Sequence, residues 1–168
     1  MHASLELAVR AVAIGVGATL VMDLWAALLR QFGVPSLNMA HLGRWIGHLV
    51  RSPWQLHSIA ATPPVRGEWW IGWCAHYAIG VTFSVLLLSV KGLGWAQSPS
   101  LFPPVLTGLV TVAAPLLILQ PGMGAGVASR HTARPVFNSL KSVLTHLVFG
   151  IGMYGAAVAT AWLWPAHG

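Results

Sequence analysis

Charged residues are scarce in this sequence. Only 7% of its 168 residues are Asp, Glu, Lys or Arg, while 56% are hydrophobic, and the mean hydropathy is +0.71. A soluble domain carries roughly a quarter charged residues, because its surface must face water. The composition therefore excludes an ordinary water-soluble domain. It predicts one integral membrane domain over residues 1–168.

Cysteine and acidic residues are also rare. The single cysteine, Cys74, excludes an intramolecular disulfide. Three acids stand against nine Lys and Arg, which gives a net charge of +6. The basic residues are scattered and the loops are short, so no separate nucleic-acid-binding domain is expected. The predicted partners are the lipid bilayer and its anionic headgroups.

Four apolar runs are long enough to cross a bilayer, since a hydrocarbon core of about 30 Å needs about 20 helical residues. The predicted fold is an all-α, membrane-embedded four-helix bundle. A kink is expected at Pro115, which lies inside the third run. The predicted spans are 5–29, 69–90, 101–120 and 140–164.

The first loop is too long to be only a connector. Within residues 37–51, Leu42, Trp45, Ile46 and Leu49 recur at helical spacing, with histidines and arginines on the opposite face. This pattern predicts an amphipathic helix lying along the membrane surface. A helix that covers the opening of a bundle would have the same pattern.

Basic residues predict the orientation, because loops rich in Lys and Arg stay in the cytoplasm. The loops after the first and third spans carry seven, against Arg10 and Lys91 on the other side. The long loops are therefore expected in the cytoplasm and both termini outside, in a multi-pass protein. The seven are Arg30, Arg44, Arg51, Arg66, Arg130, Arg134 and Lys141.

Every predicted span brings a polar group to the cytoplasmic third of the bundle. These groups are predicted to form a cluster that binds a ligand or a proton. The cluster consists of Asp23, Glu68, His76, Gln120 and His146. Asp23, His76 and His146 each lie on a stripe of small residues four apart, typical of helix–helix contacts in membranes. These three side chains should therefore face the bundle interior.

Four interpretations of this cluster stay open. The polar groups would only hydrogen-bond between helices, or they would line a site for a proton, an ion or a small ligand. A divalent metal would be bound by His48, His57 and His131 with Glu68. A haem would be held between His76 and His146 as axial ligands. No serine lies in a nucleophile elbow, so a non-enzymatic role is expected.

Anionic lipid headgroups have candidate ligands on two segments. The glycine-rich stretch "GMGAG" (122–126) offers backbone amides beside two arginines and His131, while the amphipathic 37–51 helix presents two more arginines. The four predicted headgroup ligands are Arg44, Arg51, Arg130 and Arg134.

Several words of the sequence, among them "GVGATLVMDLW", "GRWIGH", "GWCAHYAIG" and "ILQPGMGAG", carry a resemblance over nearly the whole chain. Together they resemble a family catalogued as domain of unknown function 2938. The resemblance implies a four-helix protein of the bacterial inner membrane, without an assigned activity or catalytic residues. A solute pathway through so few helices would favour a homodimer. A structural role beside another membrane protein is the further alternative.

Overall fold

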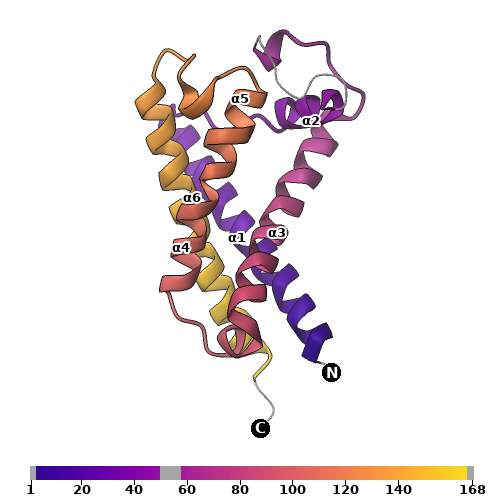
Figure 1. Ribbon diagram of the computed structural model, residues 1–168, viewed down its shortest axis with the longest axis vertical. Coiled ribbons are helices and arrows are strands. Elements are labelled where there is room, and N and C mark those ends of the chain that lie inside the picture. Colours follow the sequence, from indigo (N-terminus) through magenta and orange to yellow (C-terminus); the bar gives the residue numbers. More distant parts are fainter. Residues whose placement is uncertain (1–2, 50–57, 166–168) are drawn as a thin grey trace.

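The computed structural model describes residues 3–49 and 58–165, and these form helices and loops without a strand. The long helices are α1 (Ala3–Gln31), α3 (Glu68–Gln97) and α6 (Pro135–Leu163). The shorter ones are α2 (Met39–His48), α4 (Phe102–Thr111) and α5 (Gln120–Gly122), with 3-10 turns at Ile59–Ala61 and Val127–Ser129. The predicted all-α fold is confirmed (Figure 1).

Four stretches are long and apolar enough to cross a membrane: Ala3–Gln31, Glu68–Gln97, Phe102–Gly122 and Pro135–Leu163. Four spans were predicted and the structure has four, but most of the predicted ranges were too short. α3 continues past residue 90 to Gln97, across a break at Gly92, whose φ of 72° is left-handed. Glycine tolerates that conformation without a Cβ penalty, so the chain bends there and the helix resumes.

The third span is not one regular helix. α4 ends at Thr111, a π-helical turn follows over Pro115–Leu119, and α5 closes the span. Proline lacks the N–H that an α-helix needs, and a wider turn accommodates its ring. At Pro115, where a kink was predicted, the structure has this π-helical turn.

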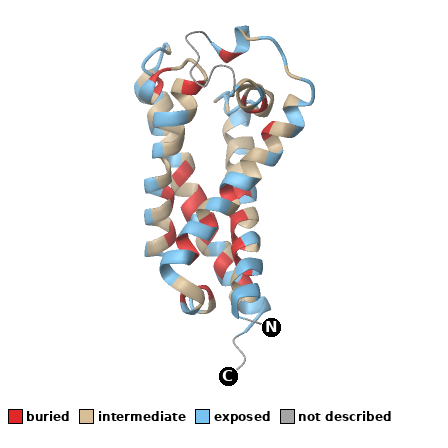
Figure 2. Cartoon of the chain, turned by 45° about the vertical axis from the view of Figure 1, so that its right-hand side comes forward, coloured by how far each residue is buried: buried red, intermediate tan, exposed pale blue. Residues whose placement is uncertain are grey.

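α1 lies between α3 and α6, and α4 packs on α6. Glycines permit the close approaches. A Cβ at Gly15 would come within 2.5 Å of Val81 Cα on α3, and one at Gly152 would come within 3.1 Å of Ala18 Cα on α1. The buried core includes Ile14, Met153 and other apolar residues of α1, α3 and α6. Figure 2 shows that the buried residues concentrate away from the long loops.

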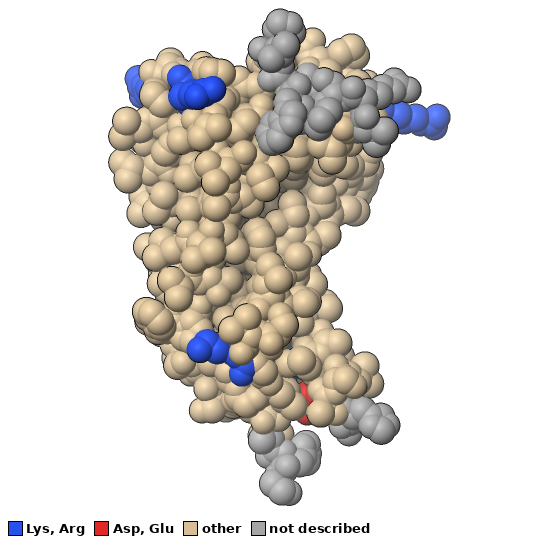
Figure 3. All heavy atoms as spheres, in the orientation of Figure 1, with Lys and Arg blue, Asp and Glu red and all other residues tan. Residues whose placement is uncertain are grey.

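The two ends of the bundle differ. α1 begins and α6 ends at one end, here called the terminal end, while α2 and α5 lie at the other, here called the loop end (Figure 1). On the face drawn in Figure 3, Lys and Arg lie near the two ends, with an uncharged band between them. That distribution suits a protein whose middle faces hydrocarbon.

The helix predicted over 37–51 is α2, which is shorter, and residues 50–51 lie outside the described chain. It begins after Asn38, whose side chain caps it by accepting from the Ala40 N–H at 2.9 Å. α2 packs closely against the start of α3, because Gly43 and Gly72 lack side chains there. A Cβ at Gly43 would overlap the Glu68 carbonyl oxygen, and one at Gly72 would overlap that of Met39.

Candidate functional site

Asp23 of α1 and two neighbouring residues of α3 form a polar site between those helices. His76 Nε2 lies 2.9 Å from Asp23 Oδ1, and the Tyr77 hydroxyl donates to Asp23 Oδ2 at 3.0 Å. The His76 and Asp23 side chains are only 13% and 21% exposed. We call these three residues the carboxylate site.

Stripes of small residues on both helices lead to this site. Gly15, Thr19 and Asp23 follow one face of α1, and Gly72, His76 and Gly80 follow one face of α3. A Cβ at Gly80 would overlap Thr19 Oγ1, so the two helices touch one turn from the site, on the side of the terminal end. Close contact between small residues is how membrane helices associate, and it brings Asp23 within reach of α3.

Two aromatic rings lie against the His76 ring. The Trp73 and Tyr77 rings lie 5.9 and 5.7 Å from the His76 ring, centroid to centroid, both edge-to-face. Trp73 Nε1 is buried and has no hydrogen-bond partner among the described residues. Neither Trp73 nor Tyr77 was predicted as a site residue. Trp73 had an available signal, because it lies three residues before His76 and so on the same face of the helix, whereas Tyr77 had none.

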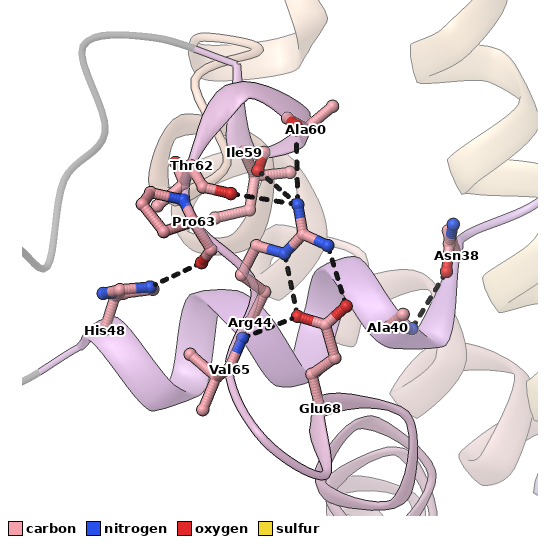
Figure 4. A network of polar contacts seen from close by, with 10 residues as sticks. All are labelled: Asn38, Ala40, Arg44, His48, Ile59, Ala60, Thr62, Pro63, Val65 and Glu68. Carbon is pink, nitrogen blue, oxygen red and sulfur yellow. Dashed lines mark hydrogen bonds and ion pairs between the residues drawn. The ribbon is translucent and has the colours of Figure 1, made fainter.

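Glu68 does not reach the carboxylate site. Its two carboxylate oxygens accept from Arg44 of α2, at 2.8 Å from Nε and 2.7 Å from Nη2 (Figure 4). A third hydrogen bond comes from the Val65 N–H at 3.0 Å. Arg44 Nη1 also donates to the carbonyl oxygens of Ile59, Ala60 and Thr62. The hydrogen bonds that Arg44 donates to Glu68 raise the pKa of Arg44, so this pair stays charged.

The other two predicted cluster members lie apart as well. Gln120 Nε2 donates to Ser142 Oγ at 3.1 Å, joining α5 to α6. His146 is 9% exposed, and its Nδ1 lies 3.2 Å from Thr111 Oγ1 of α4. The predicted set of five therefore separates into four local contacts, and only Asp23 and His76 meet directly.

The third acid of the chain lies at the terminal end. Glu6 Oε1 accepts from Arg10 Nε at 2.9 Å and from Gln97 Nε2 at 3.2 Å. Arg10 is only 1% exposed and also donates to the carbonyl oxygens of Ala96 and Trp164. Two of the three acids thus have an arginine partner. Asp23 has a histidine instead.

The predicted metal ligands are dispersed in the described chain. His48 Nε2 lies 3.0 Å from the Pro63 carbonyl oxygen, His131 Nε2 accepts from Arg130, and Glu68 binds Arg44. His57 lies outside the described residues. Across residues 3–49 and 58–165, no three His, Cys, Asp or Glu side chains are grouped as metal ligands.

The haem prediction would require rearranged histidines. His76 Nε2 faces Asp23, so that nitrogen would have to leave the carboxylate to ligate iron. His146 packs against the Phe83 and Phe149 rings, with centroids 6.5 and 6.3 Å away. Haem ligation by this pair stays a prediction.

Of the predicted headgroup ligands, Arg44 is used inside the protein. Its side chain is only 12% exposed and is bound to Glu68, which leaves little of it for lipid. Arg130 and Arg134 are exposed at the loop end, and Arg51 lies outside the described residues. A headgroup role thus fits Arg130 and Arg134 and does not fit Arg44.

Comparison with known proteins gives one match. No curated protein and no solved structure matches the chain. Residues 12–160 match the family described as "Protein of unknown function (DUF2938)". That range covers all four candidate spans in whole or large part, together with the carboxylate site. The chain belongs to the DUF2938 family, as its sequence motifs indicated.

Proposed function

We propose that this protein binds a proton reversibly at the Asp23–His76 pair, inside the membrane. The observation that carries the proposal is the choice of partner. Asp23 is paired with a histidine at 2.9 Å, whereas Glu6 and Glu68 are paired with arginines. Arginine is always protonated, but histidine changes its charge near neutral pH. The net charge of this pair therefore depends on pH.

The net charge of the pair matters because the pair would lie inside the hydrocarbon core. Asp23 lies eight residues before the end of α1 and His76 eight residues after the start of α3. Each is thus about 12 Å from its helix end, at about 1.5 Å per residue. α1 is 29 residues long, so about 6 Å at each end extends beyond a hydrocarbon core of about 30 Å. The pair would lie about 6 Å inside the core.

A net charge at such a depth is unfavourable. Insertion scales assign about 2.5–3.5 kcal/mol to a charged side chain at the centre of a membrane helix. With His76 neutral the pair carries one negative charge, and with a proton bound its net charge is zero. The membrane environment therefore favours proton uptake, and contact with water or a cation favours release. A small cation is the second candidate occupant, because the Asp23 side chain is still 21% exposed.

The membrane placement belongs to this proposal. The loop end would face the cytoplasm of a bacterial inner membrane and both termini would lie outside, since basic residues collect at the loop end. Arg130 and Arg134 would contact anionic headgroups there. A reporter enzyme active only outside the cytoplasm, fused after residue 168, should be active. Activity of a cytoplasm-only reporter at the same position would reverse the orientation.

Proton binding can be measured directly. The protein in lipid nanodiscs would be titrated with acid, and the protons taken up compared with those taken up by Asp23→Asn and His76→Gln. Both variants should lose the same single-proton step. His146→Gln is the matched control, because it removes a buried histidine outside the carboxylate site, and it should keep the step. Identical uptake by wild type and Asp23→Asn would refute the proposal and leave interhelical hydrogen bonding as the role of the pair.

A further inference from the structure

Each oxygen of the Asp23 carboxylate accepts a hydrogen bond from a different residue of α3. Oδ1 faces His76 Nε2 at 2.9 Å, and Oδ2 accepts from the Tyr77 hydroxyl at 3.0 Å. Because residues 76 and 77 are adjacent, one turn of α3 holds the carboxylate at both oxygens. Tyr77 thus contacts the acid and not the histidine's titrating nitrogen.

A bound proton has two sites with the same net charge. In one arrangement Asp23 stays ionised and His76 carries protons on both nitrogens. In the other, the acid is protonated and donates to a neutral His76. Hydrogen bonds donated to a carboxylate favour its ionised form, and those to a charged acceptor are about twice as strong as neutral ones. The Tyr77 hydroxyl therefore favours the first arrangement.

The rings around His76 fix which nitrogen remains for exchange. Trp73 and Tyr77 lie edge-to-face with the imidazole, at interplanar angles of 72° and 86°. Contact with these two rings resists rotation of the imidazole, so Nε2 keeps facing Asp23. The other nitrogen, Nδ1, makes no hydrogen bond to a described residue. It is the nitrogen that a proton can reach without breaking the pair.

Other titratable groups on the helices packed against α3 have their own partners. Arg44 and His48 on α2 bind Glu68 and the Pro63 carbonyl, and His41 is near enough to Glu68 to act on its charge. His146 on α6 faces Thr111, and on α1 Arg10 binds Glu6. None of these groups hydrogen-bonds to His76, but His146 is near enough for the two imidazoles to act on each other's charge. Asp23 is the hydrogen-bond partner that determines the protonation of His76, and Tyr77 acts through Asp23.

We propose that Tyr77 is a positioning residue that keeps Asp23 ionised, so that the proton bound by the pair resides on His76 at Nδ1. The inference rests on the proposed proton binding and specifies where the proton goes. The pair then alternates between a net charge of minus one and zero. Asp23 stays ionised in both states.

Two spectroscopic readouts test this in the full chain in nanodiscs. Nitrogen NMR of ring-labelled histidine, assigned with His76→Gln, follows Nδ1 and Nε2 separately as the pH is lowered. Infrared spectroscopy detects the carbonyl stretch of a protonated carboxyl, assigned with Asp23→Asn. Wild type should show Nε2 protonated throughout, Nδ1 gaining its proton on acidification, and no protonated Asp23 band at the same pH.

Tyr77→Phe removes only the hydroxyl. The protonated Asp23 band should then appear, and the ratio of proton on Nδ1 to proton on Asp23 should fall by about tenfold, the change expected for the loss of one charge-assisted hydrogen bond. Tyr154→Phe, which alters the chain's other tyrosine, should change neither signal. Unchanged helicity and thermal unfolding would show that both variants are folded.

The outcomes separate this inference from the proposed function. A protonated Asp23 band with neutral His76 in wild type would overturn the role of Tyr77, while proton binding would stand. An unchanged Tyr77→Phe spectrum would overturn it as well. If neither His76 nor Asp23 changes protonation between alkaline and acidic pH, the proposed function itself fails.

Discussion

Two carboxylates are bound along the same helix in contrasting ways. Glu68, at the start of α3, is held by two guanidinium nitrogens of Arg44, Nε and Nη2. Asp23 meets α3 two turns further along, where His76 and Tyr77 each bind one oxygen. Their side chains are similarly exposed, 16% for Glu68 and 21% for Asp23. The partner, and not the burial, distinguishes the two sites.

The difference separates a structural contact from a responsive one. A bidentate arginine pair has fixed charges and fixed geometry, so it holds α2 against α3 at any ordinary pH. A carboxylate–histidine pair changes its net charge when the histidine binds a proton. α3 therefore carries a permanent clamp at its end and a titratable site within the span. Three predictions test this contrast.

The largest effect is expected from the backbone contact beside the clamp. A Cβ at Gly43 would overlap the Glu68 carbonyl oxygen and come within 2.8 Å of Gly72 N. Gly43→Ala should force α2 away from α3 and destabilise the protein by about 3 kcal/mol, the upper end of the usual overpacking range, because the obstructing atoms are backbone. Thermal unfolding in detergent, followed by near-UV circular dichroism, measures the change.

Gly94→Ala is the matched control for that variant. Gly94 also lies in α3, but a Cβ there would meet nothing within 4 Å. Its unfolding temperature should stay the same or rise slightly, because alanine is the better helix former. Equal losses in both variants would show that α2 is not clamped to α3 through Gly43.

The next largest effect is expected when each of the two carboxylates is replaced in turn by its amide. Glu68→Gln should lower the unfolding temperature, since Arg44 loses its ionic partner, but it should leave proton uptake unchanged. Asp23→Asn should abolish the uptake step yet cost only about 0.6 kcal/mol, typical of an interhelical hydrogen bond in a membrane. Both quantities would be measured on both variants in the same nanodiscs. Loss of proton uptake in Glu68→Gln would remove the distinction between clamp and site.

The helices were predictable because their signal is local. Long apolar runs and stripes of small residues specify spans and the faces that meet, and Gly15, Gly72 and Gly80 do lie at close helix contacts. The ends were less predictable. α6 starts at Pro135, five residues before the predicted boundary, because proline and polar residues can occupy a first helical turn that apolarity does not mark.

The site was predictable only in part. Depth along each helix placed five polar groups in the cytoplasmic third of the bundle, but depth does not determine which groups meet. That depends on how the helices are rotated and spaced. Glu68 is bound by Arg44, which comes from a loop helix, and His146 is bound by Thr111. Neither Glu68 nor His146 therefore joins Asp23. Tyr77 was missed because a tyrosine beside a histidine carries no distinctive sequence signal.

The smallest effect is expected at His146, which serves as the baseline for the comparison. Its Nδ1 hydrogen-bonds with Thr111 Oγ1 at 3.2 Å, with no carboxylate involved. Thr111→Val keeps the shape of the side chain and removes that bond, so stability should fall by at most about 0.6 kcal/mol and proton uptake should not change. Uptake and thermal unfolding would be measured as for Asp23→Asn. If proton uptake changed, His146 would belong to the responsive site after all, because a purely structural hydrogen bond has no means of altering how the Asp23–His76 pair binds its proton.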